Sequence, residues 1–218
     1  METEHADNLK ACQMSFIGII IANFTHELKN HLAIIKESSG LQQDIIAMDK
    51  KVKDLSTLAQ FLRSVDGQVD KSLRLINFLN RFAHRMDTET ASFHLNESLD
   101  ELIELIQRFA NQRVITLERD FDRGLQPIHT NPATLQMVVF FLVDEKLANL
   151  ERKSAITIKT MQTPKGVAVA IVPNGQKAAT GDGKVRCPRD VLHIIAQRSG
   201  LHIEFGDADE VTTLTFTK

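Results

Sequence analysis

The sequence predicts an α+β protein in two parts: an N-terminal two-helix hairpin that dimerises into a four-helix bundle, followed by a two-layer α/β sandwich. Three features predict this architecture. Residues 8–87 carry apolar side chains at three- and four-residue spacing, which indicates long helices. The composition shifts at residues 87–92, and the chain beyond it alternates helical with strand-like patterns. We therefore expect a helical domain over residues 1–88 and a mixed α/β domain over residues 93–218.

Two long amphipathic helices are expected in the first part, with a turn near Asp49–Lys51. The apolar stripe of the first helix consists of Ile17, Ile21, Phe24, Leu28, Leu32 and Ile35. The second helix has a more regular, coiled-coil-like seam, formed by Leu55, Leu58, Leu62, Val65, Val69, Ser72, Ile76, Leu79 and Ala83. Two such helices cannot bury both stripes fully against each other, so we expect a second copy of the chain to complete the core. The alternative is a monomeric hairpin capped by the rest of the chain.

The second part is expected to begin with a helix over residues 95–112, for which Asn96 is a suitable N-cap. The elements expected after it are a strand at 114–121, a turn at 127–132, a helix at 134–150, strands at 155–161 and 166–172, a glycine-containing loop at 174–184, a helix at 188–199, and strands at 201–205 and 211–217. Helices combined with a mostly antiparallel sheet favour a two-layer packing.

The bulk composition excludes several classes of function. The 218 residues include 43% hydrophobic and 25% charged residues, an ordinary globular balance, and the net charge of −2 gives no footprint for nucleic acid or an anionic membrane. The two cysteines, Cys12 and Cys187, have no metal-like spacing and do not indicate a disulfide framework. The apolar run at residues 14–24 is shorter than a spanning helix needs. We therefore expect a cytoplasmic protein.

One histidine stands out on the first helix. His26 falls on roughly the opposite face of the helical wheel from the apolar stripe, and Asn30 lies one turn further on the same face. Small residues, Ala22 and Ala33, flank it, and Glu27 lies at the edge of that face. An exposed imidazole that a nearby carboxylate orients can attack a phosphoryl group through its other nitrogen. The alternative is a single exposed histidine on a solvated helix face.

A family resemblance adds to this chemistry. Residues 24–30 resemble the phosphoacceptor motif of sensor histidine kinases, in which an acidic, an aliphatic, a basic and an Asn or Thr residue follow the histidine. Residues 74–79 resemble the end of that family's second dimerisation helix. Residues 93–99 resemble the entry to its ATP-binding domain, and residues 128–138 the segment that leads into its asparagine-bearing helix. The resemblance covers almost the whole chain in the family's order.

The resemblance implies roles for individual residues. It makes His26 the phosphoacceptor, Glu27 the base that also orients the ring, and Asn30 a helper in dephosphorylation of a response regulator. The sequence departs from the family at His31, where most members have proline. We expect His31 to be a packing residue near the buried seam. The surface around the acceptor that would meet a partner consists of Ala22, Asn23, Lys29, Ala33, Ile34 and Glu37.

The elements with which that family holds Mg-ATP are degenerate in this sequence. Phe141 and Glu145 stand at the two positions where the family has asparagine, and Pro173 replaces the aspartate that binds adenine. Gly175 is the one glycine kept of two, and residues 186–189 lack the Gly-x-Gly turn that meets the phosphates. We therefore expect no ATP, no other cofactor and no metal on this chain. The alternative is misregistration, with residues 181–184 as a displaced phosphate loop.

A dimeric helical domain with an acceptor histidine and a degenerate nucleotide domain resembles the dimeric histidine phosphotransferases of phosphorelays. The resemblance implies that His26 passes a phosphoryl group to or from an aspartate of a response regulator receiver domain, whose acidic pocket supplies Mg²⁺. An upstream histidine kinase is a further expected partner. Two alternatives remain at this point: an active soluble kinase core that uses ATP, and a non-catalytic module that binds a regulator.

Overall fold

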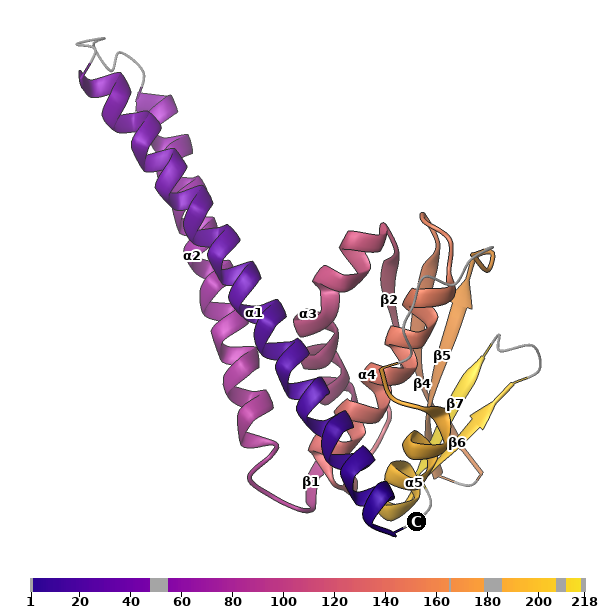
Figure 1. The fold of residues 1–218 in the computed structure, drawn as a ribbon. Helices are drawn as coiled ribbons and strands as arrows, with labels where there is room; N and C mark the ends of the chain where they lie inside the picture. The colour runs from indigo at the N-terminus through magenta and orange to yellow at the C-terminus, as the bar shows by residue number, and fades with distance from the viewer. Residues whose placement is uncertain (1, 48–54, 165, 179–185, 207–210, 217–218) are drawn as a thin grey trace.

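The computed structural model describes residues 2–47, 55–164, 166–178, 186–206 and 211–216. The first part is a hairpin of two long helices, α1 (Glu2–Ala47) and α2 (Leu55–His84). The turn expected at Asp49–Lys51 lies outside the described residues. The distal half of the hairpin projects beyond the rest of the molecule, whereas its base packs against the C-terminal domain (Figure 1). The predicted order of a helical hairpin followed by a mixed α/β domain is confirmed.

The C-terminal domain has three helices and a five-stranded sheet. Its helices are α3 (Leu95–Arg113), α4 (Pro132–Asn149) and α5 (Arg189–Arg198). The strands of the sheet are β2 (Thr116–Phe121), β4 (Ala155–Thr163), β5 (Gly166–Asn174), β6 (Leu201–Phe205) and β7 (Thr212–Phe216). A separate ribbon pairs two three-residue strands, β1 (Ala91–Phe93) and β3 (Ile128–Thr130).

The strand order is β2-β4-β5-β7-β6. Strands β2 and β4 are parallel, with Thr116 opposite Ala155, because α4 crosses between them. The other neighbours are antiparallel, so the expectation of a mostly antiparallel sheet is confirmed. The central strand β5 is buried continuously from Gly166 to Ile171. Helix α4 begins at Pro132, and the N-cap side chain of Asn131 accepts a hydrogen bond from the Thr134 N–H at 2.7 Å.

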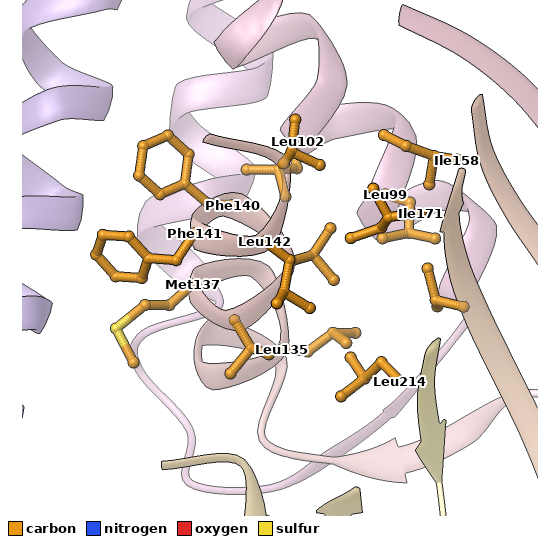
Figure 2. Close-up of a cluster of buried hydrophobic side chains, with 14 of the residues drawn as sticks. Leu99, Leu102, Leu135, Met137, Phe140, Phe141, Leu142, Ile158, Ile171 and Leu214 are labelled. Atoms are coloured by element: carbon orange, nitrogen blue, oxygen red, sulfur yellow. The ribbon is translucent and has the colours of Figure 1, made fainter. Parts of the chain in front are cut away.

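The core extends through three layers because α4 is apolar around its whole circumference. One face of α4 packs, together with α3, on the inner face of the sheet, and the other face meets the hairpin (Figure 2). The side chains drawn in that figure point accordingly: Leu135 and Leu142 lie toward the sheet, whereas Met137, Phe140 and Phe141 point away from it. Helix α4 is therefore the layer that joins the two parts of the chain.

The predicted stripe of α1 is only part of its buried surface. Cys12, Phe16 and Ile20 are buried against the C-terminal domain, although none of them belongs to that stripe. Ile21 and Leu32, which do belong to it, are 47% and 54% exposed. Helix α1 thus has two apolar faces. One is covered by the C-terminal domain, and the other is only partly covered in the single chain, where Phe24 and Leu28 are half-buried.

Two further expectations are corrected by the structure. Asn96 is not the N-cap of α3, because the cap position is taken by His94. The Asn96 side chain instead donates to the Asp122 carbonyl at 2.8 Å and accepts from Thr160 Oγ1 at 2.9 Å, so it ties the start of α3 to the sheet. The expected turn at 127–132 contains the short strand β3. Among the described residues, no helix combines the length and apolar character that crossing a bilayer requires.

Candidate functional site

His26 lies on the exposed outer face of α1. Its neighbour one helical turn on is Asn30, whose Nδ2 is 3.3 Å from His26 Nδ1. The helix turns these two side chains outward because Phe24 and Leu28 pack against the core on the inner side. The exposure of His26 and its pairing with Asn30 agree with the placement expected from the helical wheel. Among the described residues, no group of three or more His, Cys, Asp or Glu side chains is arranged to hold a metal ion.

The orientation of the Asn30 amide is linked to which ring nitrogen of His26 carries the proton. When the amide N–H donates to Nδ1, the proton of a neutral ring lies on Nε2. When the amide turns by half a rotation, its oxygen accepts from Nδ1–H and leaves the Nε2 lone pair facing solvent. The second arrangement is the nucleophilic one, because the outward nitrogen then has a free electron pair. Asn30 can therefore stabilise an imidazole that attacks an incoming group.

Glu27 does not pair with the His26 ring, to which the sequence interpretation assigned it. Its carboxylate faces α3, where Oε1 lies 3.5 Å from Arg108 Nε. The Glu27 side chain is 33% exposed and that of Arg108 20% exposed, so the ion pair lies at the edge of the interface between α1 and α3. The acidic residue next to the acceptor is thus held by the C-terminal domain.

Asn23 is buried, with 2% exposure, and its Nδ2 donates to the Leu105 carbonyl of α3. This finding removes Asn23 from the expected partner surface, because its amide already binds the C-terminal domain. The other residues expected on that surface are exposed: Ala22, Lys29, Ala33, Ile34 and Glu37.

His31 behaves as a packing residue. Its Nδ1 lies 3.3 Å from Ser72 Oγ on α2, and Ser72 Oγ donates its own proton to the Gln68 carbonyl at 2.8 Å. The His31 nitrogen must therefore be the donor, which places the proton on Nδ1. Beside it, a groove of about 580 Å³ runs between the hairpin and α3. Its polar lining residues are Glu27, His31, Lys71, Arg74, Asp100, Glu104, Gln107, Arg108 and Asn111.

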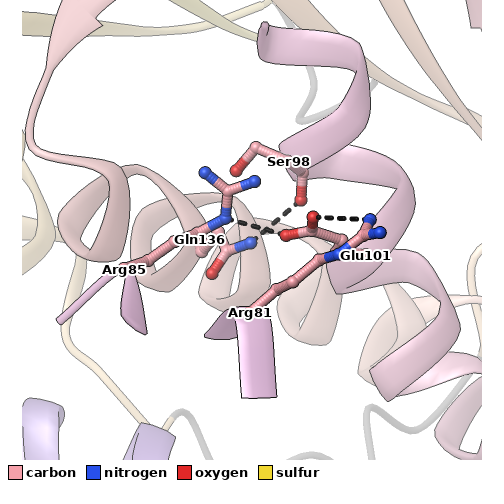
Figure 3. A network of polar contacts seen from close by, with 5 residues as sticks. All are labelled: Arg81, Arg85, Ser98, Glu101 and Gln136. Carbon is pink, nitrogen blue, oxygen red and sulfur yellow. Dashed lines mark hydrogen bonds and ion pairs between the residues drawn. The ribbon is translucent and has the colours of Figure 1, made fainter. Parts of the chain in front are cut away.

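The hairpin and the C-terminal domain are joined by a buried junction. Phe16 of α1 packs edge-on against Phe82 of α2, with ring centroids 5.4 Å apart, and lies 5.2 Å from Phe140 and 6.3 Å from Phe141. Glu101 of α3 extends the junction with a polar contact (Figure 3). Its carboxylate is almost fully buried and accepts from Arg85 Nε at 2.8 Å, and Arg81 Nη1 lies 3.5 Å away.

A pair of thiols lies at the same junction. Cys12 of α1 and Cys187, just before α5, are both buried and free, and each thiol influences the pKa of the other. Burial raises the pKa of both thiols, and the contact with Cys12 raises that of Cys187 further. Neither cysteine therefore has the character of a reactive thiolate.

The positions expected to have lost nucleotide contacts take part in other interactions. Phe141 packs in the junction, as its contact with Phe16 shows. Glu145 accepts two hydrogen bonds from Arg189, Nη2 to Oε1 at 2.5 Å and Nε to Oε2 at 3.2 Å. Its neighbour Asp144 accepts from Arg186 at 3.1 Å. Both arginines come from residues 186–189, which replace the expected glycine turn.

Three more residues near the expected nucleotide positions are Asp144, Pro173 and Gly175. Burial raises the pKa of the Asp144 carboxyl, although Arg186 and Arg113 act in the opposite direction. Gly175 has φ +152°, and a Cβ at this position would collide with Ser154 Oγ, so the backbone turn itself requires glycine. Pro173 lies in β5 opposite Ile156. The alternative phosphate loop at residues 181–184 lies outside the described residues.

A cavity of about 900 Å³ adjoins these positions. Its lining includes Glu145, Lys146, Asn149, Pro173, Gly175 and Lys177. Space for a ligand therefore exists where the sequence resemblance would put a nucleotide. The side chains at Pro173 and Gly175 offer no acceptor to an adenine amino group, and Glu145 is already bound to Arg189.

Sequence interpretation did not identify Arg108, Glu101 or Phe16 as residues that connect the two parts of the chain. For Phe16 a signal existed, because Cys12, Phe16, Ile20 and Asn23 recur at helical spacing on a second face of α1. For the two charged residues of α3 we find no signal in the sequence, because their partners lie on distant helices.

No protein-family model matches the sequence, and no curated protein matches it. Solved structures do match. The nucleotide-free catalytic domain of histidine kinase ThkA is 17% identical with a TM-score of 0.50, over 60% of this chain and 99% of that one. The Acinetobacter baumannii histidine kinase AdeS is 16% identical with a TM-score of 0.49, over 88% of this chain and 97% of that one. A bacterial phosphotransferase is 8% identical with a TM-score of 0.48, over 93% and 96%. At these identities the likeness concerns the fold alone, and it is the fold of a histidine kinase catalytic domain.

Proposed function

We propose that this chain acts in two-component signalling as a histidine phosphotransferase, with His26 as the residue that carries the phosphoryl group. The observation that carries the proposal is the exposed His26 ring, whose proton position Asn30 can set while the outward nitrogen faces solvent. The resemblance of residues 24–30 to a phosphoacceptor motif supports the same assignment. The substrate would be an aspartyl phosphate on the receiver domain of a response regulator.

The proposed transfer is a balanced substitution at phosphorus. The unprotonated nitrogen of His26 attacks, a P–N bond forms, the P–O bond to the aspartate breaks, and the carboxylate leaves with the electron pair. The proton on the other ring nitrogen stays in place. The reverse step delivers the group to the aspartate of a second regulator. Mg²⁺ would be held by the acidic pocket of the regulator, and the barrier falls chiefly by positioning and charge neutralisation.

The contacts around Glu145 support transfer without ATP. A side chain with both carboxylate oxygens bound to Arg189 has little capacity left for a metal ion, and Phe141 is packed in the junction. The junction itself also favours this reading, because Phe16 and Glu101 hold the C-terminal domain on the hairpin at one place. A kinase has to bring its nucleotide to the acceptor histidine, whereas a phosphotransferase only has to leave that histidine open to a partner.

An ATP-dependent kinase is the second candidate, and the cavity beside Glu145 is the observation that favours it. The two functions differ in the source of the phosphate. Wild type and His26→Gln are incubated with labelled ATP, and separately with receiver domains charged from labelled acetyl phosphate. We expect label on wild type only from the charged receiver domains, and none on His26→Gln. Label from ATP alone would establish the kinase. No label from either source would leave a regulator-binding module as the better account.

We also propose that two copies of the chain form a four-helix bundle. Most of the large apolar side chains that are exposed in the single chain lie on the hairpin: Met14, Ile21, Leu32, Ile34, Leu41, Ile46, Leu58, Leu62, Val69, Leu73 and Ile76. Four of those on α2 lie in the seam that the heptad pattern predicts, so a second hairpin would cover them: Leu58, Leu62, Val69 and Ile76.

The oligomeric state tests this proposal directly. We expect a dimer by light scattering at micromolar concentration, and a monomer for Leu62→Glu, which places a charge in the seam. Asp66→Lys, an exposed position on the same helix that already carries a charge, serves as the control and should remain dimeric. A monomeric wild type would refute the bundle.

A further inference from the structure

Two contacts between α1 and α3 lie side by side at the acceptor turn. Asn23 donates to the Leu105 carbonyl, and one helical turn later Glu27 pairs with Arg108. The spacing is four residues on α1 and three on α3, so both contacts lie on facing helix surfaces. The first contact is buried and holds the backbones of the two helices together. The second therefore forms between side chains whose helices are already fixed in place.

The Glu27 carboxylate lies beside Arg108 and not beside the acceptor ring. Glu27 directly follows His26 on α1. In the structure its Oε1 lies 3.5 Å from Arg108 Nε. The polar neighbour of the His26 ring is Asn30. Arg108 also lines the groove next to the acceptor, so a partner that enters there would meet it.

We propose that Arg108 is a positioning residue of the C-terminal domain that withholds the Glu27 carboxylate from His26. The inference rests on the proposed phosphotransfer at His26 and deepens it. A carboxylate bound to arginine is a poorer acceptor for the ring N–H than a free one. Release of Glu27 from Arg108 would let it accept a hydrogen bond from Nδ1–H, which raises the nucleophilicity of Nε2. The C-terminal domain, or a partner that displaces Arg108, would thereby set the reactivity of the acceptor.

The first measurement is independent of any partner. Ring ¹⁵N chemical shifts of His26, assigned with His26→Gln, report the share of the Nδ1–H tautomer. We expect Arg108→Gln to raise that share, because Glu27 is released to accept from Nδ1–H. Arg108→Lys keeps a positive charge near Glu27 and should resemble wild type. In the double variant Arg108→Gln with Glu27→Gln, the shifts should return to those of wild type.

The second measurement is phosphorylation of His26 by phosphoramidate, in which the P–N bond to ammonia breaks as the P–N bond to the ring forms. We expect Arg108→Gln to accelerate it about two- to fivefold, equivalent to about 0.4–1 kcal/mol at 1.4 kcal/mol per tenfold. Adding Glu27→Gln should abolish the gain. Arg119→Gln serves as the matched control, because Arg119 pairs with Asp100 and Glu104 of α3, whereas Glu27 pairs with Arg108. It should match wild type in both measurements.

The outcomes separate this inference from the proposed function. Unchanged ring shifts and an unchanged rate in Arg108→Gln, with the fold intact by circular dichroism, would overturn the positioning role. A gain that persists in the double variant would do the same, because it would not pass through Glu27. Transfer from charged receiver domains tests the function alone. Its absence, together with a Glu27-dependent change in the ring shifts, would refute the phosphotransferase and leave the positioning role standing.

Discussion

Replacement of Phe16 by alanine tests whether the hairpin and the C-terminal domain are held together by the aromatic junction. The Phe16 ring is 2% exposed and contacts Phe82, Phe140 and Phe141. Truncation of a buried phenylalanine to alanine costs about 3–5 kcal/mol, because the burial is lost and a cavity remains. For a chain of this size, each kcal/mol lowers Tm by about 2–4 °C. We therefore expect Tm to fall by about 6–20 °C.

The assay is thermal unfolding by far-UV circular dichroism, since the sequence has no Trp or Tyr to report by fluorescence. Amide hydrogen exchange on the same variant locates the loss. The C-terminal domain has its own core between α3, α4 and the sheet, so its central strand β5 should keep its protection while the base of the hairpin loses it. Met14→Ala is the control, because Met14 lies on the same helix and is 63% exposed. Its effect should stay within about 0.5 kcal/mol.

The reasoning fails if Phe16→Ala unfolds at the temperature of Met14→Ala. It also fails if the variant loses protection evenly across both parts of the chain, because the junction would then not be a separable contact. A loss confined to the hairpin base, with the expected fall in Tm, is the result that the packing of Phe16 predicts.

Three further predictions concern the C-terminal domain. Burial raises the pKa of the Asp144 carboxyl above its ordinary 3.8, so the folded state binds this proton more tightly than the unfolded state does. The resulting stability is present below pH 3.8 and is lost as pH rises through the raised pKa. In thermal melts across this range, the Tm of Asp144→Asn should therefore rise relative to that of wild type as pH increases toward neutrality. Gly175→Ala should cost about 1–3 kcal/mol in urea unfolding because of its φ of +152° and the collision with Ser154, and Ser154→Gly in the same chain should recover part of the loss. A retained nucleotide site would stabilise the fold by about 2.7 kcal/mol when Mg-ATP is present at a hundred times its Kd. Because we expect no such site, millimolar Mg-ATP should not raise Tm for wild type or for Phe141→Asn.

Much of the fold follows from the sequence because its helices and strands have strong periodicity. The heptads of α2 and the alternation in β4 and β5 lie close to the observed bounds of those elements. The strands β1 and β3 were not anticipated because three residues are too short for a period-two pattern. The stripe predicted on α1 does not include its second apolar face, which Cys12, Phe16 and Ile20 form. Only the packing of Phe16 against α2 and α4 shows that it is buried rather than exposed.

The sequence also predicts the local contacts of the candidate site better than its long-range contacts. The exposure of His26 and its contact with Asn30 are local, since residues four apart on a helix are neighbours. The partners of Asn23 and Glu27 are not local, because both lie on α3. Leu105, for example, is 82 residues from Asn23 along the chain. A buried asparagine next to an exposed alanine has no distinctive sequence pattern. The orientation of Glu27 therefore depended on the tertiary structure.

The junction also explains why the residues at the expected nucleotide positions suit this chain. Phe141 lies on the face of α4 that the hairpin covers, where an asparagine would have to bury an amide without an evident partner, at about 1–3 kcal/mol. A phenylalanine there adds to the contact with Phe16 instead. The Glu145–Arg189 pair likewise ties α4 to α5. The side chains at the expected nucleotide positions thus strengthen the packing that holds the C-terminal domain in place, and from that position Arg108 reaches the residue next to His26.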